Sequence, residues 1–493
     1  MANEVELKLA LPESAQRPFL RHPMLGTATA RQTVQLVNIY YDTPDLTLRK
    51  SGIAVRLRRQ GRTWLQTVKC AGSSAGGLSS RPEWETAYGG QFDFSAIDDE
   101  AVRTKLEKRS VAARLTPLFE TSFRRTTWHF GNVQLMFDRG WIAADGRREA
   151  ISELEFELAD GEIDALFALA DVFAARLPLM PAPLSKAERG VRLHLNAAPA
   201  PARAMDIPLA PEMSPRAAFR TIALSCLDQM QRNHAGAVAS DDPEYIHQMR
   251  VAMRRLRASL RLFSPVLPTD YAKHLLPAVQ DIMARLGKAR DLDVLLAEIC
   301  APVIAALPGE PRLAALAGVI TDDRYAARRH AVRHLEAREF GQLMVQLAQL
   351  LHAPALDEVP AGASVAAFAR GRLLRLRRKV RDLAGQAKLD DPLSLHALRI
   401  GTKRLRYALE FFATLARGKA QRRLANWLAE VQGTLGELND LANAGQLLMN
   451  CAGHDERLRE AVTLIGGWHG PRHARLMARL PKLLEELRAL ARR

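Results

Sequence analysis

The sequence predicts a two-domain protein, with an antiparallel β-sheet or barrel in its N-terminal part and an all-helical C-terminal part. Short alternating segments rich in β-branched and aromatic residues recur in the first 200 residues. Leu, Ala and Arg with helical spacing dominate the remainder of the 493 residues. Between these patterns, residues 197–214 are rich in Ala and Pro, which is typical of an extended linker.

The N-terminal strands are expected from their period-two alternation. EVELKLA, from Glu4, and ISELEFEL, from Ile151, each place charged side chains on one face and apolar side chains on the other. VQLVNIYYD, IAVRLRR, TWLQTVKC, RRTTWHF and NVQLMFDRG have a similar composition and are divided by Gly, Pro and Asp turns. Helices are expected near residues 96–118 and 161–177.

The helical part of the sequence repeats itself. DDPEYIHQMRVAMRRLRASLRLF, from Asp241, aligns with DDPLSLHALRIGTKRLRYALEFF, from Asp390, at an offset of 149 residues. The same offset carries Ala217-Ala218-Phe219 onto residues 366–368, and it carries LGKARDLDV onto LGELNDLAN. A common offset across three separated blocks indicates a duplicated helical bundle.

The net charge of +16 is concentrated in the helical part. Residues 204–493 contain 43 Lys and Arg against 30 Asp and Glu. Such an excess attracts any polyanion, including nucleic acid, an anionic membrane surface and polyphosphate. Charge alone does not choose among these partners.

The cysteine usage and the hydropathy pattern indicate a cytoplasmic protein. No uncharged apolar run of about 18 residues occurs, and the first residues do not resemble a signal peptide. We therefore expect no membrane partner. The cysteines are widely scattered and show no CxxC spacing, which fits a reducing compartment; they are Cys70, Cys226, Cys300 and Cys451.

Several N-terminal strands carry acids and bases on the same kind of face. A single strand of this type would be an ordinary half-solvated strand, but its recurrence favours a shared charged interior. Buried charges are tolerated only when they are paired or bind metal. Carboxylates that hold a divalent cation, beside bases that hold phosphates, meet both demands. The residues concerned are Glu4, Glu6, Lys8, Arg56, Arg58, Lys69, Glu83, Glu85, Arg125, Asp138, Glu153, Glu155 and Glu157.

Eight motifs of the N-terminal part resemble the CYTH family of triphosphate tunnel metalloenzymes. They are EVELK as ExExK, IYYDTPD, RLR, TVK, RPEWE, FDRG, ELEFE and SKAERG, in the family's order over about residues 1–200. The resemblance implies an eight-stranded antiparallel β-barrel that forms a tunnel. It implies metal binding by Glu4, Glu6, Asp138, Glu153 and Glu155, and a catalytic, phosphate-binding role for Lys8, Arg56, Arg58, Lys69, Arg125 and Lys186.

The adjacent Arg124 and Arg125 leave open which arginine faces the tunnel. We favour Arg125, because it shares strand parity with Thr127 rather than with Trp128.

The CYTH resemblance implies an inorganic triphosphatase, which cleaves triphosphate to diphosphate and phosphate with Mg²⁺ or Mn²⁺. The sequence contains no GxxxxGK[ST] loop, HExxH motif or zinc-ligand spacing that would favour another chemistry. No obvious feature of the sequence indicates a pocket for a nucleobase, so inorganic triphosphate is the expected substrate. Two alternatives stay open: a non-catalytic polyphosphate-binding or targeting protein, and a nucleoside triphosphate-acting CYTH enzyme of the adenylate cyclase or thiamine triphosphatase type.

Both copies of the helical repeat carry a basic stripe. Its residues in each copy fall within one arc of roughly 80° on a helix, separate from the apolar stripe. Such a stripe is either a polyanion-binding surface or a solvated helix face, and its recurrence favours the first. Its members are His247, Arg250, Arg254, Arg257, His396, Arg399, Lys403 and Arg406.

HQMRVAMRRLR, its copy and the LGKARD segment resemble the CHAD domain, over about residues 212–490. The resemblance implies two pseudo-symmetric four-helix bundles that bind inorganic polyphosphate, so nucleic acid is not expected as a partner. It also makes polyphosphate granules a candidate location. The copies are unequal, because Lys403 stands where the first copy has Arg254. We therefore predict a CYTH domain over residues 1–200, a linker over 201–213 and a CHAD domain over 214–490.

Overall fold

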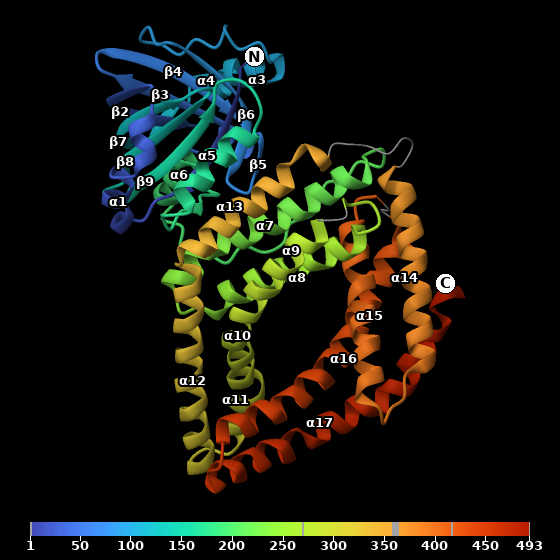
Figure 1. Ribbon diagram of the computed structural model, residues 1–493. Coiled ribbons are helices and arrows are strands. Elements are labelled where there is room, and N and C mark those ends of the chain that lie inside the picture. Colours follow the sequence, from blue (N-terminus) through green and yellow to red (C-terminus); the bar gives the residue numbers. More distant parts are fainter. Residues whose placement is uncertain (1, 269–270, 357–363, 416–417, 493) are drawn as a thin grey trace. The chain divides into compact units, whose positions relative to one another are not determined.

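The structure, a computed structural model, describes residues 2–268, 271–356, 364–415 and 418–492 (Figure 1). The chain forms two compact units. The first comprises Met1–Ala202, Gln231–Val238 and Leu335–Ala353. The second comprises Arg203–Met230, Ala239–His334 and Pro354–Arg493.

The strands of the first unit form one antiparallel sheet that closes on itself. They are β1 (Ala2–Ala10), β2 (Ala30–Asp42), β3 (Ile53–Gln60), β4 (Thr63–Cys70), β5 (Ser73–Ala75), β6 (Leu78–Ala87), β7 (Thr116–Phe130), β8 (Val133–Ala144), β9 (Arg147–Leu158) and β10 (Met180–Pro181).

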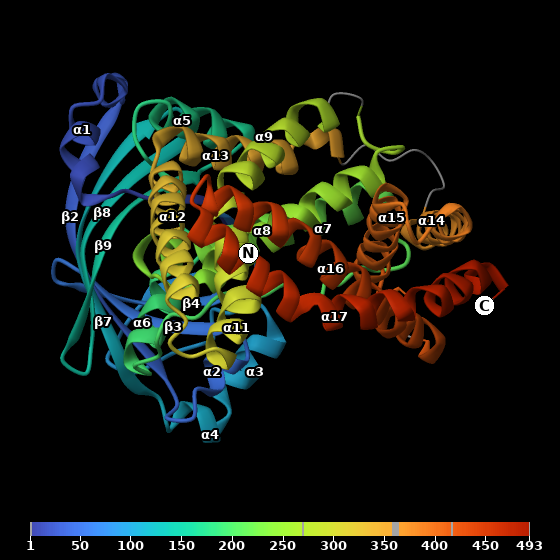
Figure 2. The ribbon, with the colours of Figure 1, turned by 90° about the horizontal axis from the view of Figure 1, so that it is seen from below.

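Eight of these strands make the wall of the barrel. Their hydrogen-bonded order is β1-β9-β8-β7-β2-β3-β4-β6, and β6 pairs back with β1. Figure 2 shows the neighbouring strands β7, β8 and β9 of this wall. The short strands β10 and β5 extend β1 and β6. The eight-stranded antiparallel barrel that the CYTH resemblance implies is therefore confirmed.

The alternation of EVELKLA and ISELEFEL sets the inside and the outside of the barrel. β1 and β9 are antiparallel, with Lys8 opposite Glu155 and Leu7 opposite Phe156. Side chains that lie opposite each other in such a pair share a face, so the charges of both strands point the same way. Leu7 and Phe156 are fully buried on the other face.

Helices cover the outer face of the barrel. α5 (Asp164–Ala174) contributes Phe173, whose ring centroid lies 6.1 Å from that of Phe156. α13 (Arg338–His352) packs against α5 within the same unit, and Gln342 Nε2 donates to Asp171 Oδ1 over 3.1 Å. The smaller helices of the unit are α1 (Gln16–Leu20), α2 (Thr47–Lys50), α3 (Glu100–Glu107) and α4 (Arg109–Ala112).

One more helix, α6 (Lys186–His194), packs against the barrel strands β7, β8 and β9. It begins with a capping box between Ser185 and Glu188. A Cβ added at Gly190 would lie 2.1 Å from the ring of Phe119, so only glycine permits this close approach. The packing fixes the first residue of the helix, Lys186, in a buried position.

The second unit is helical in its described residues. Its last four helices pack around one apolar core, and the fourth packs back on the first, which makes a four-helix bundle (Figure 1). They are α14 (Val365–Gln386), α15 (Pro392–Phe411), α16 (Lys419–Ala452) and α17 (Glu456–Arg488). The earlier helices are α7 (Pro215–Ala239), which extends across both units, α8 (Pro243–Phe263), α9 (Tyr271–Arg285), α10 (Gly287–Val294), α11 (Ala301–Ala306) and α12 (Pro311–Leu335).

The internal repeat is visible in the helix boundaries. α8 and α15 begin at Pro243 and Pro392, which are 149 residues apart, and each has an aspartate N-cap. The copies differ where the first has α9, α10, a π-helical turn over Leu295–Cys300 and α11, whereas the second has the single helix α16. Pro302 lacks the N–H of a regular helix, which contributes to this break.

None of the helices in the described part of the chain is long and apolar enough to cross a membrane.

Candidate active site

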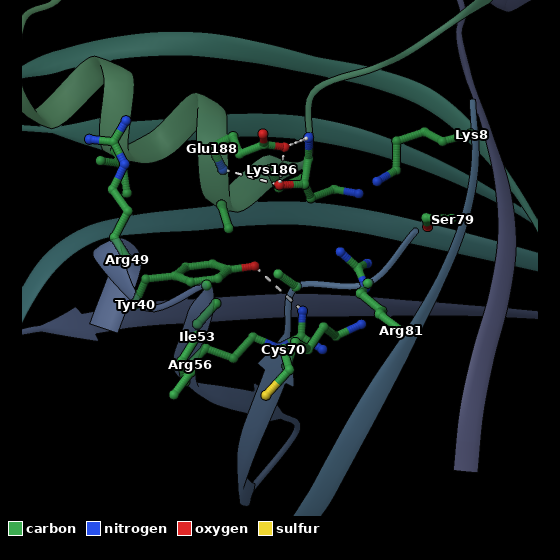
Figure 3. A pocket seen from close by; sticks show the side chains of 18 of the residues that line it. Lys8, Tyr40, Arg49, Ile53, Arg56, Cys70, Ser79, Arg81, Lys186 and Glu188 are labelled. Carbon is green, nitrogen blue, oxygen red and sulfur yellow. Dashed lines mark hydrogen bonds between the residues drawn. The ribbon is translucent and has the colours of Figure 1, made fainter. Parts of the chain in front are cut away.

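A cavity of about 550 Å³ lies within the barrel, and many of the side chains that line it are charged (Figure 3). Lys8 from β1 and Lys186 from α6 point into the same space. The cavity brings together nine of the residues predicted from the CYTH resemblance, namely Glu4, Glu6, Lys8, Arg56, Arg58, Lys69, Arg125, Glu155 and Lys186.

The other two predicted residues, Asp138 and Glu153, lie beside the cavity residues. They are opposite each other on β8 and β9, and their exposed fractions are 0% and 2%. With Glu155 they form the acidic trio, whose ligand oxygens all lie within 4.8 Å of one another. Three carboxylates at this spacing are the donor set that Mg²⁺ and Mn²⁺ prefer, so these residues fit a divalent cation.

Lys186 and Arg125 form ion pairs with the acidic trio, and Arg189 Nη1 lies 3.1 Å from Glu153 Oε2. Lys186 Nζ lies 2.7 Å from Asp138 Oδ2 and 2.9 Å from Glu155 Oε1, and it also contacts Glu153. Arg125 donates from Nε and Nη2 to the two oxygens of Asp138, over 2.7 and 2.6 Å, and it contacts Glu155. Burial alone would raise the pKa of Glu155, but Lys186 and Arg125 outweigh it and hold that pKa well below its usual value.

Glu4 and Glu6 form a second acidic group. Lys69 Nζ lies 2.8 Å from Glu4 Oε2, and Arg81 Nη2 lies 2.7 Å from Glu6 Oε1. The structure therefore divides the five predicted metal ligands between two places.

Burial, followed by the charges of Glu4, Glu155 and Glu6, raises the pKa of the nearby Glu157 to about 7. This wall of the cavity therefore favours additional positive charge.

Arg56 and Arg58 make another part of the wall basic. Arg56 Nη1 donates to Tyr40 Oη over 3.5 Å, and its Nη2 lies 3.4 Å from Glu83 Oε1. Arg58 Nε donates to Asn38 Oδ1 over 3.0 Å. Burial and the charge of Arg56 lower the pKa of Arg58 to about 10. An anion in the cavity would relieve this crowding of positive charge.

The strand register separates Arg124 from Arg125. Arg125 lies opposite Asp138 and lines the cavity, whereas Arg124 is exposed. Arg125 is thus the arginine of the pair that lines the cavity, as we expected from the strand parity that it shares with Thr127.

Sequence reasoning missed several cavity residues, among them Tyr40, Arg49 and Arg81 (Figure 3). Arg81 shares strand parity with Glu83 on β6, so the alternation could have found it. Tyr40 could have been found in the same way, because it shares strand parity with Asn38 on β2, and both side chains are buried. Arg49 lies on the short helix α2, where no strand period applies.

The basic stripes of α8 and α15 form a second candidate site, within the helical unit. Arg250 Nη2 lies 3.4 Å from Asp291 Oδ1, and its counterpart Arg399 Nη2 lies 3.8 Å from Asp440 Oδ1. These residue pairs are related by the 149-residue offset. Among the described residues, the buried Nε atoms without a hydrogen-bond partner include those of Arg250, Arg254, Arg399 and Arg406.

The two stripes meet where α8 and α15 pack together. Burial, followed by the charges of Arg399 and Arg254, lowers the pKa of Lys403 to about 8. Burial, followed by the charges of Arg261 and Arg404, also lowers the pKa of Arg257. The stripes therefore make one crowded cationic surface, which an anion would stabilise.

The two histidines of the stripes differ in their surroundings. Burial and the charge of Arg290 lower the pKa of His247, so this imidazole is neutral at neutral pH. His396 Nδ1 lies 3.2 Å from Asn439 Oδ1. At neutral pH, the positive charge of the α8 stripe therefore comes from its arginines.

Comparison with known protein families identifies both parts of the chain. Residues 2–191 match the CYTH domain, and residues 221–449 match the CHAD domain. The chain is a CYTH domain followed by a CHAD domain. The barrel and the described residues that line its cavity, except Arg232, lie in the CYTH domain, and the basic stripes lie in the CHAD domain.

Two known proteins are similar to parts of the chain. An inorganic triphosphatase of Haemophilus influenzae is 30% identical in an alignment of 204 residues, which covers 39% of this chain and 55% of the relative. The chain thus spans about half the length of this curated relative. The crystal structure of the CHAD domain from the plant Ricinus communis is 33% identical, with a TM-score of 0.51, and the match covers 59% of this chain and 96% of that one.

Proposed function

We propose that the CYTH domain hydrolyses inorganic triphosphate to diphosphate and phosphate with Mg²⁺ or Mn²⁺, and that the CHAD domain binds inorganic polyphosphate. The observation that carries the first part is the cavity, which is lined by the six predicted phosphate-binding bases and by Glu155 of the acidic trio. The similarity to an inorganic triphosphatase supports the same reaction.

Residues in and beside the cavity have different roles in the proposed reaction. The acidic trio would hold the divalent cation, which supplies neutralisation of phosphate oxygens and activation of water. Lys8, Arg56, Arg58 and Lys69 would bind the anionic chain and fix its direction in the tunnel. Positive charges already in place around the leaving diphosphate lower the barrier, because they need no reorganisation during the reaction.

The test of the tunnel reaction is a comparison of substrates. We expect phosphate release from triphosphate to be faster than from ATP or long-chain polyphosphate, with Mn²⁺ or Mg²⁺ present, and to stop when a chelator is added. Faster cleavage of ATP or thiamine triphosphate, or formation of cyclic nucleotide, would favour the nucleotide-acting alternative. No hydrolysis of any of these compounds would favour a binding protein.

The stripes of the CHAD domain support polyphosphate binding. Arg250 and Arg399 make only long contacts with Asp291 and Asp440, over 3.4 and 3.8 Å, and a linear chain of phosphates could bind several of the crowded bases at once. Binding of this kind is mainly electrostatic and weakens as salt is added. A nucleic acid would compete equally well with polyphosphate at matched salt if the stripes served as a general polyanion site.

The pKa of Lys403 predicts a pH dependence of this binding. Below a pKa of about 8 the ammonium is charged and attracts polyphosphate, and above it the attraction is lost. We expect the affinity for long-chain polyphosphate to fall about fivefold between pH 7 and pH 9, which corresponds to roughly 1 kcal/mol for one charge-assisted contact. Fluorescence anisotropy at constant ionic strength measures the change. Lys403→Met should remove most of it, and an unchanged pH profile in this variant would exclude Lys403 as the cause.

A further inference from the structure

We propose that Lys186 occupies the cation position of the acidic trio when no metal is bound, and that the divalent cation displaces its ammonium group into the cavity, where triphosphate binds it. This inference rests on the proposed metal-dependent hydrolysis. It makes metal binding and substrate binding mutually dependent through one side chain.

The contacts of Lys186 place its ammonium where a metal ion would bind. Nζ contacts one oxygen from each member of the trio, Asp138, Glu153 and Glu155. Asp138 and Glu153 are not among the described residues that line the cavity, whereas Lys186 is. Its side chain therefore contacts both the cavity and the two most deeply buried carboxylates.

A metal ion and this ammonium group exclude each other. Mg²⁺ lies about 2.1 Å from its oxygen ligands. An ion at that distance from the same three carboxylates leaves no room for Nζ among them. A divalent ion also repels the ammonium, so Lys186 has to leave when the ion binds.

Displacement of Lys186 from the acidic trio is energetically unfavourable unless its ammonium group gains a new partner. Lys186 is 7% exposed, and a buried ammonium without a partner is strongly unfavourable. Arg125 shares Asp138 and Glu155 with Lys186, and so it also loses part of its pairing when the ion takes these oxygens. A phosphate chain in the cavity supplies the negative charge that both side chains need.

The resulting coupling is reciprocal. Triphosphate binding raises the affinity for the metal, because it accepts the displaced Lys186, and metal binding raises the affinity for triphosphate by the same factor. The enzyme would then hold little metal until its substrate arrives. In this scheme Lys186 competes with the ion for the acidic trio, and after its displacement it binds the phosphates.

The test measures Mn²⁺ binding to the full chain without substrate. We expect Lys186→Met to bind Mn²⁺ about tenfold more tightly than the wild type, within the range typical of coupled sites, as measured by electron paramagnetic resonance of free Mn²⁺. A side chain that merely supported the fold would give the opposite sign, because its loss would loosen the site. Lys186→Gln provides a second neutral variant if the methionine variant does not fold, and it should shift the affinity in the same direction.

Arg58→Met is the control for loss of positive charge. It removes a cation from the same cavity, but Arg58 pairs with Glu85 and Asn38 rather than with the trio. We expect its Mn²⁺ affinity to change by less than about threefold. Unchanged or weaker Mn²⁺ binding in both Lys186 variants would overturn the inference.

A failure of the proposed function would look different. If Asp138→Asn bound Mn²⁺ as tightly as the wild type, the acidic trio would not be the metal site, and both the displacement of Lys186 and the role of the trio in the proposed reaction would be wrong. If Asp138→Asn abolished binding while the Lys186 variants left it unchanged, only the displacement of Lys186 would be wrong.

Discussion

We expect Asp138→Asn combined with Glu155→Gln to lower the rate of phosphate release from triphosphate by about 1,000-fold, equal to about 4 kcal/mol of transition-state stabilisation. The two substitutions remove the charge from two of the three carboxylates that lie within 4.8 Å of one another, while keeping their shapes. The site would then lose the divalent cation that the proposed reaction requires. Initial rates at saturating Mn²⁺ and triphosphate measure the effect.

Glu149→Gln is the matched control for this pair of substitutions. Glu149 lies on the same strand, β9, and binds helix α6 through Arg189 Nε over 2.7 Å and Arg192 Nη2 over 3.0 Å. It is not part of the acidic trio. We expect its activity to stay within about threefold of the wild type. An equal loss in Glu149→Gln would show that α6 had loosened, and full activity in the double variant would reject the trio as the metal site.

If the CHAD stripes bind polyphosphate as proposed, we expect neutralisation of their crowded part to weaken binding of long-chain polyphosphate by about 100-fold or more at 0.1 M salt. The variant replaces Arg250, Arg254, Arg399 and Lys403 with glutamine. Each residue contributes a charge-assisted contact of about 1 kcal/mol or more to a phosphate chain. The salt dependence of the affinity should also become shallower, because fewer counterions are released on binding. Fluorescence anisotropy with labelled polyphosphate measures both quantities.

A charge-matched variant on α14 separates this site from general attraction. α14 carries a dense group of exposed bases, four of which can be replaced with glutamine to give the same change in net charge: Arg370, Arg375, Arg378 and Lys379. We expect this variant to lose less than about fivefold in affinity, because only long-range attraction is reduced. Equal losses in the two variants would mean that polyphosphate binds through net charge and not at the stripes.

The barrel and much of its cavity could be predicted from local patterns. The alternation of β1 and β9 determines which side chains face inward, and the register that places Lys8 opposite Glu155 agrees with it. The duplicated helices could be predicted because the offset of 149 residues recurs in widely separated blocks. Both inferences depend on a period, which a single sequence displays directly.

The remaining features depend on tertiary packing. Nothing in the period of SKAERG shows that Lys186 contacts the acidic trio, because its position depends on the fit of Gly190 against Phe119. The assignment of α13 to the first unit could not be predicted either, since its helical pattern resembles that of its neighbours in the sequence. Its contact with α5, through Gln342 and Asp171, has no local signal.

The most direct test of the account is the position of Mn²⁺ in a crystal grown with a non-hydrolysable triphosphate analogue. We predict an anomalous peak within about 2.5 Å of carboxylate oxygens of Asp138, Glu153 and Glu155, with Lys186 turned from the trio toward the analogue. Mn²⁺ and the analogue bound only on the outer surface of the barrel, with Lys186 still paired to all three carboxylates, would contradict it.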